Sequence, residues 1–407
     1  MLKSFEARGY RNLDTRIELA KVNLLVGPNN SGKSNLIRAI RFAADAIERP
    51  GPHHDWGQAI RDHGGVDMVQ RKWENDGRWL FGQRRLKLGW ELDLGDVKGS
   101  QTLAIAGARG ETPQVAEEHF SADLFGNKAT VDRTADGVRI EWSNMDDASP
   151  SAWTRSDPLR PLLSESKTTL TKDLPSDTLA YLEGGSSILR TWFKNAHRYN
   201  FGSFEPHEMT LPTRTSDPMP TLTPDGANLA NVLRHVETAH GVGLVEVTRR
   251  MSELLPGLER LWVRDAAGQS LWVETYREGE TIKLRDYSDG TIMALVLALL
   301  LFSPEQSSLL MIDEPELNLH PAWLKVVGRW LQGATAPKQI LISTHSPDLL
   351  DTFTEGFQSG EVRLLVAGGE QGVRAVAPDE LAALMKDGWE LGDLYRVGHP
   401  ALGGWPW

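Results

Sequence analysis

The sequence predicts an α/β fold that carries an antiparallel β lobe and a mostly helical insertion. Three observations indicate it. Residues 24–26 form a short apolar run before a glycine-rich loop, and apolar residues recur at helical spacing after that loop. Two further apolar runs, residues 309–312 and 339–342, end in polar residues, which is typical of parallel strands buried on both faces. Alternating apolar and polar residues from about Trp79 to Trp142 indicate antiparallel strands between these two ends.

Composition limits the class of protein. With 407 residues, 40% of them hydrophobic, the chain can hold two or three domains, or one large domain with an insertion. It has no cysteine, which excludes disulfides, zinc-thiolate sites and iron–sulfur clusters. The N-terminus has no apolar run of signal-peptide length, and the longest apolar stretch, residues 292–302, is too short to span a bilayer. We therefore expect a cytoplasmic protein without a membrane segment.

The charge balance argues against a surface that attracts nucleic acid as a whole, because the net charge is -11. The densest basic groups are Arg71 with Lys72, and Arg84 and Arg85 with Lys87. Charge runs this short usually form solvated faces. Binding to nucleic acid is therefore expected to be indirect if it occurs.

The first 48 residues predict the order strand, strand, loop, helix. Residues 3–7 and 16–19 alternate between apolar and polar side chains ahead of the apolar run at residues 24–26. After the loop, apolar side chains recur at helical spacing, at Leu36, Ile37, Ile40, Ala43, Ala44 and Ile47. This order places the loop between the end of a buried strand and the start of a helix.

The loop fits the pattern G-x-x-x-x-G-K-[ST] of a P-loop. Its residues, with the one that follows, are Gly27, Pro28, Asn29, Asn30, Ser31, Gly32, Lys33, Ser34 and Asn35. The glycines let the backbone wrap a phosphate at a helix N-terminus, where unsatisfied N–H groups favour an anion. Lys33 would reach the β and γ oxygens of a nucleotide, and Ser34 would ligate magnesium. A chance glycine turn is the alternative, but the flanking strand and helix favour a nucleotide with Mg²⁺ as the ligand, and the family resemblance given below implies that this nucleotide is ATP.

The middle of the chain separates this loop from the later motifs. We expect antiparallel strands at residues 86–94, 101–106, 114–120 and 138–142. We expect helices at residues 177–197 and 229–240, a proline-rich break at residues 211–226, and a hairpin of residues 261–264 and 271–274. The chain then divides into residues 1–147, a mostly helical insertion of residues 148–285, and residues 286–407.

Two acidic residues end the apolar run at residues 309–312. Carboxylates at the end of a buried parallel strand lie at the edge of the sheet where ligands bind. Asp313 could hold magnesium through a water, and Glu314 could orient and deprotonate the attacking water in phosphoryl transfer. An acidic turn is the simpler interpretation, but the P-loop upstream favours catalysis.

Two further candidate sites, at His345 and at Ser288 with Asp289, gain support from the P-loop and the two acidic residues. His345 follows residues 339–342, a strand expected beside the one that ends at Asp313, and could contact a γ-phosphate. Ser288 or Asp289 can cap the apolar helix that follows. Capping alone explains both residues there, while the functional interpretation is a second anion site for another subunit's nucleotide.

Together, the segments GPNNSGKSN, YSDGT, LLMIDEPELNLHP and STHSP resemble ABC-type ATPases of the SMC, RecF and OLD-like group, the branch called AAA-type or AbiEii/OLD-type ATPases. The resemblance covers about residues 1–48 and 287–407. It implies an ABC-type P-loop ATPase head. In that family, Ser288, Asp289, Gly290 and Thr291 would stand at the LSGGQ signature and close over the partner subunit's γ-phosphate.

The resemblance also implies roles for single residues. Glu314 matches the catalytic glutamate, Asp313 the Walker B aspartate and His345 the switch histidine. Arg11 and Asn12 match a segment whose arginine approaches the nucleotide. Residues 315–321 match the loop that meets its counterpart across a head-to-tail ATP sandwich.

Two departures from the family pattern affect the site. No glutamine stands in a clear Q-loop, although Gln70 is a candidate, and Asp289 replaces the first glycine of LSGGQ. After His345 only about sixty residues remain, too few for the Toprim nuclease domain of nuclease-bearing relatives. Any nuclease is then expected to be a separate polypeptide.

Three functions fit these features. The leading hypothesis is an ATP-driven switch, a homodimer or a higher assembly of dimers, that controls a separate effector, a nuclease, in defence against phage. A RecF-like DNA-repair ATPase is the second, and the acidic balance speaks against it. A transporter's nucleotide-binding subunit is the third, and the long insertion speaks against that.

Overall fold

The computed structural model describes most of the chain. The described residues are 1–48, 56–63, 73–75, 78–80, 86–106, 114–124, 127–134, 137–143, 151–154, 187–214, 221–239, 243–265, 270–304, 307–335, 337, 339–368 and 372–404. They form two compact units, and neither is continuous in sequence. Unit 1 contains residues 1–20, 27–197 and 365–376, and unit 2 contains residues 21–26, 198–364 and 377–407.

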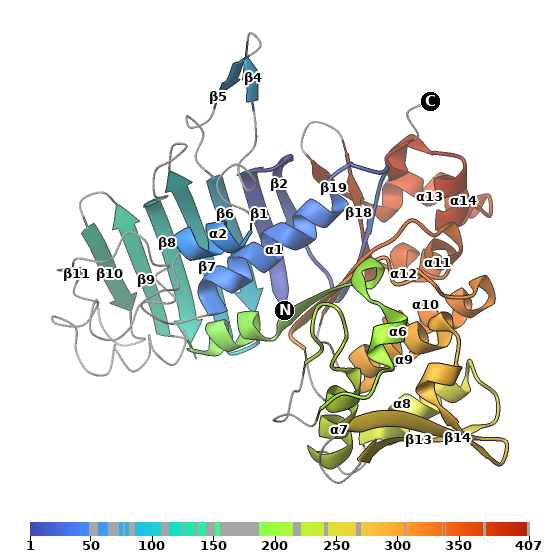
Figure 1. Ribbon diagram of the computed structural model, residues 1–407. Coiled ribbons are helices and arrows are strands. Elements are labelled where there is room, and N and C mark those ends of the chain that lie inside the picture. Colours follow the sequence, from blue (N-terminus) through green and yellow to red (C-terminus); the bar gives the residue numbers. More distant parts are fainter. Residues whose placement is uncertain are drawn as a thin grey trace. The chain divides into compact units, whose positions relative to one another are not determined.

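Unit 1 is built on an antiparallel sheet (Figure 1) with the strand order β11-β10-β9-β8-β7-β6-β1-β2. The strands are β1 (Leu2–Tyr10), β2 (Leu13–Glu18), β6 (Leu86–Asp93), β7 (Val97–Ala106), β8 (Gln114–Leu124), β9 (Asn127–Thr134), β10 (Gly137–Ser143) and β11 (Ser151–Thr154). Phe5 of β1 pairs with Ile17 of β2 on one side and with Trp90 of β6 on the other. The predicted antiparallel lobe is confirmed, and β9 and β11 are strands that the sequence did not predict.

Helices α1 (Lys33–Glu48) and α2 (Trp56–Asp62) lie over one face of this sheet (Figure 1). Every apolar position predicted for the first helix is buried: Leu36, Ile37, Ile40, Ala43, Ala44 and Ile47. Residues 187–194 are also helical, and Phe193 meets Trp90 edge-on with ring centroids 5.0 Å apart. Unit 1 further contains the two-stranded sheet of β4 (Trp73–Asn75) and β5 (Arg78–Leu80).

The helix predicted for residues 177–197 is only partly correct. Residues 177–186 lie outside the described residues, and β12 (Ala196–Asn200) replaces the last helical turn. The strand forms because these residues pair beside β16 (Leu309–Asp313) in the second sheet, a tertiary contact that local helix propensity does not report.

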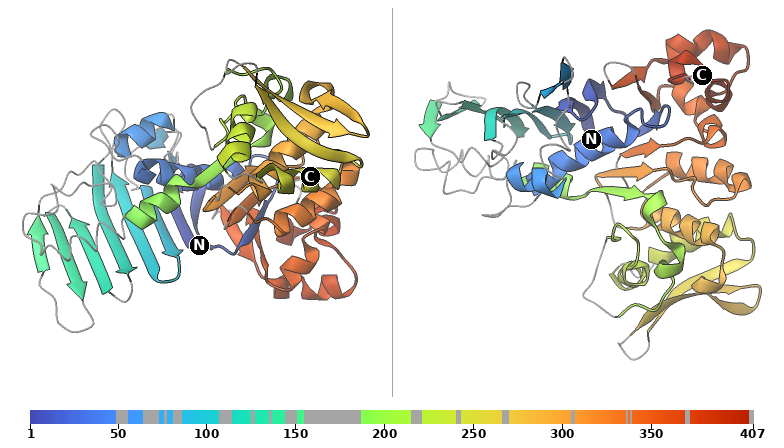
Figure 2. Two further views of the ribbon diagram at one scale, coloured as in Figure 1. Left: turned by 90° about the horizontal axis from the view of Figure 1, so that it is seen from below. Right: turned by 45° about the horizontal axis from the view of Figure 1, so that its top comes forward.

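The second sheet has the order β12-β16-β17-β3-β18-β19, and Figure 2 shows it from two further directions. Its other strands are β3 (Val22–Val26), β17 (Ile340–Ser343), β18 (Val362–Ala367) and β19 (Val373–Val376). Within unit 2, β16 pairs with β17 and β17 with β3, both in parallel. All residues of these three strands are buried, as their continuous apolar runs predicted.

Helices and a small antiparallel sheet complete unit 2. The helices are α6 (Pro206–Met209), α7 (Leu229–Ala239), α8 (Gly243–Ser252), α9 (Asp289–Phe302), α10 (Leu324–Gln332), α11 (Pro347–Asp351), α12 (Thr354–Gln358), α13 (Pro378–Lys386) and α14 (Leu391–Arg396). The 3-10 helices are η2 (Phe201–Ser203), η3 (Leu284–Asp286), η4 (Pro321–Trp323) and η5 (Pro400–Leu402). The small sheet contains β13 (Leu258–Asp265), β14 (Leu271–Arg277) and β15 (Glu280–Lys283), which confirms the predicted hairpin.

Helix α9 is the core helix of unit 2 and is apolar on all sides. From Ile292 to Phe302 every side chain is buried except that of Leu300, which is partly exposed. Phe302 at its end meets the Trp330 ring edge-on, and the Arg250 guanidinium lies 4.2 Å from the Phe302 ring centroid. Trp330 donates its indole N–H to Glu253 at 3.0 Å. Helix α9 is therefore enclosed by protein.

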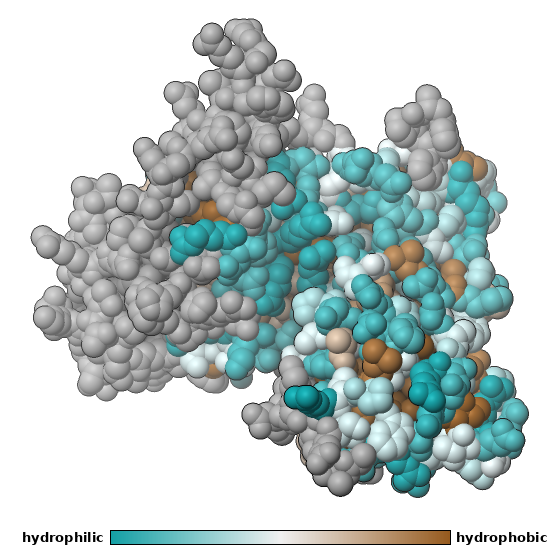
Figure 3. Space-filling model, in the orientation of Figure 1, coloured by the Kyte–Doolittle hydropathy of each residue, from teal (hydrophilic) through white to brown (hydrophobic). Residues whose placement is uncertain are grey.

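The described surface on the face drawn in Figure 3 is mostly hydrophilic, with hydrophobic residues in small groups. Within the ranges that the structure describes, no helix is both long enough and apolar enough to cross a membrane.

Replacing Leu297 by alanine should destabilise unit 2 by about 2–5 kcal/mol, because the side chain is fully buried in α9 and its removal leaves a cavity. Leu300→Ala, on the same helix but partly exposed, is the matched control and should cost clearly less. Urea unfolding followed by circular dichroism measures both. Equal losses for the two variants would contradict the enclosure of α9.

Candidate functional site

The P-loop of unit 1 has the backbone that its glycines predict. Gly27 and Gly32 have φ values of 142° and 103°. A Cβ at Gly27 would lie 2.4 Å from the carbonyl oxygen of Ala367, and one at Gly32 would lie 2.4 Å from the Asn12 side chain. Both positions therefore require glycine, for conformation and for space.

Lys33 is the first residue of α1, and its ammonium group turns back into the loop. Its Nζ donates to the carbonyl oxygens of Gly27 at 2.8 Å and Pro28 at 2.9 Å, and the residue is 7% exposed. Ser31 Oγ is buried and makes no hydrogen bond to any of the described residues. A buried ammonium and a buried hydroxyl at a helix N-terminus fit a phosphate group.

The turn at residues 9–13 lies against this loop. Asn12 donates its amide to the Ser31 carbonyl oxygen at 3.0 Å and accepts from the Asn35 amide at 2.8 Å. Arg11, with φ of 50°, donates from Nη1 to Asn35 Oδ1 at 3.3 Å. The structure thus brings the two predicted residues of this turn to the P-loop within unit 1.

In unit 2, the carboxyl ends of β16, β17 and β3 meet at one edge. Asp313 pairs with Ser343, and Ser343 pairs with Leu25, the residue before the last one of β3. Ser343 donates its hydroxyl to Asp313 Oδ1, and Arg198 Nη2 lies 3.4 Å from Asp313 Oδ2. The aspartate is therefore held by a hydroxyl on one oxygen and by a guanidinium on the other.

Glu314 lies just past this edge in a left-handed backbone conformation, with φ of 56°. Its N–H donates to the Ser343 carbonyl oxygen at 2.9 Å, which ties the turn to β17. A non-glycine residue in this conformation costs about 1–2 kcal/mol, so the surrounding structure must hold it there. The strained backbone leaves the carboxylate partly exposed beside His345, whose Nε2 is 3.7 Å from Glu314 Oε1.

Glu316 fixes the backbone that carries His345. Its Oε1 accepts from the Thr344 hydroxyl and from the His345 N–H, both at 2.8 Å. Its Oε2 is buried and, within the described part of the chain, lacks a hydrogen-bond partner. Burial raises the pKa of Glu316, and the charge of Glu314 acts in the same direction, while its accepted hydrogen bonds oppose the rise.

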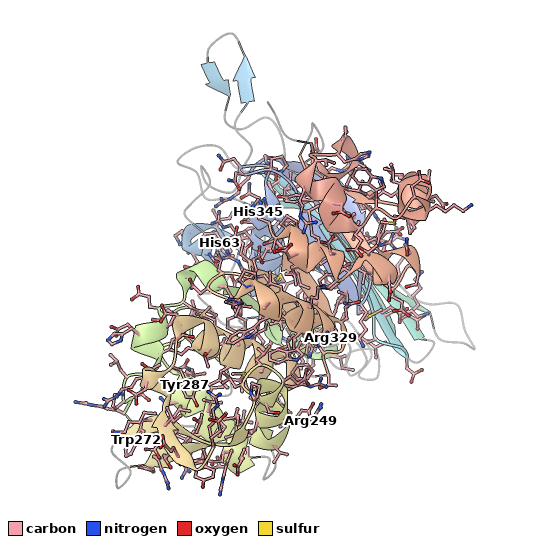
Figure 4. All side chains as sticks on the ribbon, turned by 90° about the vertical axis from the view of Figure 1, so that its right-hand side faces the viewer. His63, Arg249, Trp272, Tyr287, Arg329 and His345 are labelled. Carbon is pink, nitrogen blue, oxygen red and sulfur yellow. The ribbon has the colours of Figure 1, made fainter. Side chains whose placement is uncertain are left out.

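The ring of His345 (labelled in Figure 4) has a further contact with the C-terminal helix α14. Its Nδ1 lies 2.9 Å from the Tyr395 hydroxyl. Burial raises the pKa of Tyr395 to about 12, and the charge of Glu316 adds to the rise. The phenol therefore stays protonated at neutral pH.

The predicted signature segment caps α9. Ser288 is the N-cap residue, and its Oγ accepts from the Thr291 N–H at 3.4 Å and lies 3.1 Å from Thr291 Oγ1. A Cβ at Gly290 would lie 2.5 Å from the Asn318 carbonyl oxygen, so a glycine is needed there. The loop of residues 315–321 therefore packs directly on the start of α9. Of the two capping residues considered, the structure selects Ser288, and Asp289 is the first residue of the helix.

Other predicted residues stay unplaced. Gln70, Arg71, Lys72, Arg84 and Arg85 lie outside the described residues. In the ranges that the structure covers, no group of three or more His, Asp or Glu side chains could hold a metal ion by itself. Ser34 belongs to unit 1 and Asp313 to unit 2, so their joint role as magnesium ligands remains a prediction.

Sequence reasoning missed three residues of this edge: Arg198, Glu316 and Tyr395. Arg198 contacts Asp313, which lies 115 residues away in the sequence, and Tyr395 contacts His345, which lies 50 residues away. Glu316 stands in the motif that suggested the family, so its place two residues after Glu314 could have drawn attention to it. No local pattern identifies the other two.

Similarity to known proteins identifies the family of this chain. Residues 22–88 and 132–351 match the family described as "AAA domain, putative AbiEii toxin, Type IV TA system", and the chain belongs to that family. The predicted class, an AAA/ABC-type ATPase of the SMC/RecF-like group, is confirmed by this match.

Three solved structures of SMC head domains are also similar to this chain. The first is an SMC head bound to the C-winged helix domain of ScpA, at 15% sequence identity over 92% of this chain and 97% of that chain, with a TM-score of 0.47. The second is the SMC head domain from Thermotoga maritima, at 15% identity over 92% of this chain and 98% of that chain, with a TM-score of 0.39. The third is an Smc head domain with an extended coiled coil, bound to the C-terminal domain of ScpA derived from Pyrococcus furiosus, at 13% identity over 95% of this chain and 98% of that chain, with a TM-score of 0.42.

Glu316→Gln should become more stable relative to the wild type as pH rises. The wild-type carboxyl has its pKa raised above the ordinary value of 4.5 in the folded chain, so its contribution is present below that value and is lost as pH rises through the folded pKa. Glutamine keeps an acceptor for Thr344 and His345 and carries no charge. Urea unfolding between about pH 4.5 and 7 measures the difference in unfolding free energy.

The exposed Glu355 provides the control, since Glu355→Gln removes a carboxylate that is not buried. Its unfolding free energy relative to the wild type should change little over the same range. A difference for Glu316→Gln that stays flat or shrinks with rising pH would show that its carboxyl is not disfavoured by burial.

Proposed function

We propose that the chain hydrolyses ATP as a head-to-tail homodimer and acts as a switch for a separate effector, a nuclease, in prokaryotic defence against phage. The observation that carries the proposal is the group at the sheet edge of unit 2. There the strained Glu314 lies beside His345, directly after the strand that ends in Asp313. Family membership supports the ATPase part independently.

Nucleotide binding is assigned to the P-loop. Lys33 would exchange its two carbonyl acceptors for phosphate oxygens, and the backbone from Gly27 to Ser34 would enclose the β-phosphate. Arg11, which is fixed through Asn35 at the loop, would add a second cation near the phosphates. Magnesium, when bound through Ser34 and a water on Asp313, would neutralise charge on the phosphates.

Hydrolysis is assigned to Glu314 and His345. Glu314 would accept the proton of the attacking water, because its carboxylate is partly exposed and the turn at residue 314 fixes its direction. His345 would donate a hydrogen bond to the γ-phosphate from Nε2, the ring nitrogen that faces Glu314. Arg198 would balance the charge of Asp313 when no metal is present.

The dimer part rests on the signature segment at the start of α9. Ser288 and the backbone of Asp289, Gly290 and Thr291 form a helix N-terminus, which favours an anion. The family resemblance assigns that anion to the γ-phosphate on a second copy. The loop of residues 315–321, which packs on this end of α9 through Asn318, would then lie at the interface between copies.

The defence part rests on the family alone. Its description names a putative toxin of a Type IV TA system, which agrees with a role in defence. The effector is proposed as a separate chain, on the family resemblance of the ATPase motifs. Purification of the chain with its neighbouring gene products, with and without ATP, would identify that effector.

Glu314→Gln should lower the ATPase turnover number at least about 100-fold and leave ATP binding intact, because the water loses its base while the P-loop is unchanged. Turnover is measured by phosphate release, and binding by the rise in melting temperature with ATP and Mg²⁺. Glu278→Gln is the matched control, since Glu278 also has a left-handed φ, 52°, and is exposed.

Lys33→Ala is the control for binding and should lose both the turnover and the thermal protection by ATP. Lys21→Ala, at an exposed lysine, should lose neither. Unchanged turnover in Glu314→Gln would remove this residue from the mechanism. ATP that protects none of these proteins would remove the P-loop assignment.

Mixing two inactive variants tests the shared site. Ser288→Ala and Lys33→Ala should each impair hydrolysis as homodimers, but a mixed dimer has one site with both Lys33 and Ser288 intact. With random pairing, the mixture should recover about a quarter of the wild-type turnover. Phosphate release from coexpressed, differently tagged chains measures it. No recovery in isolated mixed dimers would exclude a head-to-tail site.

A further inference from the structure

We propose that Tyr395 is a positioning residue that keeps the ring proton of His345 on Nε2, and that the C-terminal helix α14 thereby sets the rate of ATP hydrolysis. Only the link between α14 and the rate of ATP hydrolysis rests on the proposed function. The position of the ring proton of His345 concerns the chain without nucleotide and does not depend on the proposed function.

The two ring nitrogens of His345 face different partners. Nε2 lies 3.7 Å from a carboxylate oxygen of Glu314, and Nδ1 lies 2.9 Å from the Tyr395 hydroxyl. An ionised carboxylate only accepts hydrogen bonds, whereas a phenol both donates and accepts. The neutral ring is therefore most stable with N–H on Nε2 and with the phenol donating to Nδ1.

This arrangement matters for the proposed role of His345. A neutral imidazole has one N–H, and only the Nε2–H form can donate to a γ-phosphate on the side of Glu314. With the proton on Nδ1, a lone pair on Nε2 would face both the carboxylate and the phosphate. The Tyr395 hydroxyl favours the productive form, in the way that a second group orients a catalytic histidine elsewhere.

Helix α14 is tightly joined to α11, which begins two residues after His345. A Cβ at Gly392 would lie 2.1 Å from the Pro347 carbonyl oxygen, so the two helices meet backbone to backbone. The Gly392 N–H donates to Asp351 Oδ1 at 2.7 Å, and Arg396 pairs with Asp351 at 3.0 Å and with Asp348. The position of the phenol is therefore tied to the helix that follows His345.

The phenol is also shielded. Tyr395 is 4% exposed, and its hydroxyl lies at hydrogen-bond distance from His345. Removing that single oxygen changes the hydrogen bond and leaves the packing of the ring in place. Tyr395→Phe is therefore a narrow test of the role.

The first measurement is the ¹⁵N NMR spectrum of the histidine rings in the nucleotide-free protein, with His345 assigned from the spectrum of His345→Gln. The wild-type ring should show the Nε2–H form, and Tyr395→Phe should show a mixture of the two neutral forms. Tyr276→Phe, which removes a hydroxyl from the small sheet of unit 2, should leave the His345 signals unchanged.

The second measurement is steady-state ATP hydrolysis. Tyr395→Phe should lower kcat about tenfold with an unchanged KM, since the P-loop is unaffected. Tyr276→Phe should match the wild type. A kcat equal to that of the wild type, in a Tyr395→Phe protein whose His345 ring has changed form, would overturn the link between α14 and hydrolysis.

The NMR spectrum and the ATPase assay distinguish a failure of the role of Tyr395 from a failure of the proposed function. A wild-type ring that is already a mixture, that carries its proton on Nδ1 or that is doubly protonated would overturn the assignment, as would a ring unaffected by Tyr395→Phe. If the wild-type protein hydrolyses no ATP, the proposed function fails, and the NMR result still decides whether Tyr395 positions His345.

Discussion

The parallel pairing of β16, β17 and β3 is the constraint on which the rest of unit 2 depends. Because Asp313 is in register with Ser343, and Ser343 with Leu25, the ends of three strands that are distant in sequence reach one edge together. The turn at Glu314 is then tied to β17 by a backbone hydrogen bond, and this anchor holds the residue in a conformation that it would otherwise avoid. A change of register would separate all these groups at once.

The polar groups around this edge hold Asp313 and the backbone before His345 in place through hydrogen bonds. Arg198 and the Ser343 hydroxyl hold Asp313, and Glu316 holds the backbone of Thr344 and His345 through one oxygen. The second oxygen of Glu316 is buried and has no hydrogen-bond partner among the residues that the structure describes, which is a cost that the fold tolerates there. Such local costs are common where a structure keeps groups ready for chemistry.

The sequence predicted the parts of this design that are local. Continuous apolar runs identified β3, β16 and β17, and the P-loop and the Ser288 cap follow from short spacing rules. β9, with the sequence NKATVDRT, carries too few apolar residues to show an alternating pattern, and its pairing with β8 and β10 defines it as a strand. Contacts such as Arg198 with Asp313 depend on how distant segments meet, so no spacing rule reveals them.

The place of β3 within its sheet has a consequence for how the chain is made. β3 ends at Val26, but its neighbour β17 begins only at Ile340, and β18 at Val362. A ribosome that adds about 5–20 residues per second needs roughly 15–60 s to supply these neighbours. Throughout that time a strand that is buried along its whole length has no sheet to join, and α9 emerges before α10, whose Trp330 meets its last residue, Phe302. Nascent chains should therefore depend on chaperones that shield apolar segments until the last third of the protein has been synthesised.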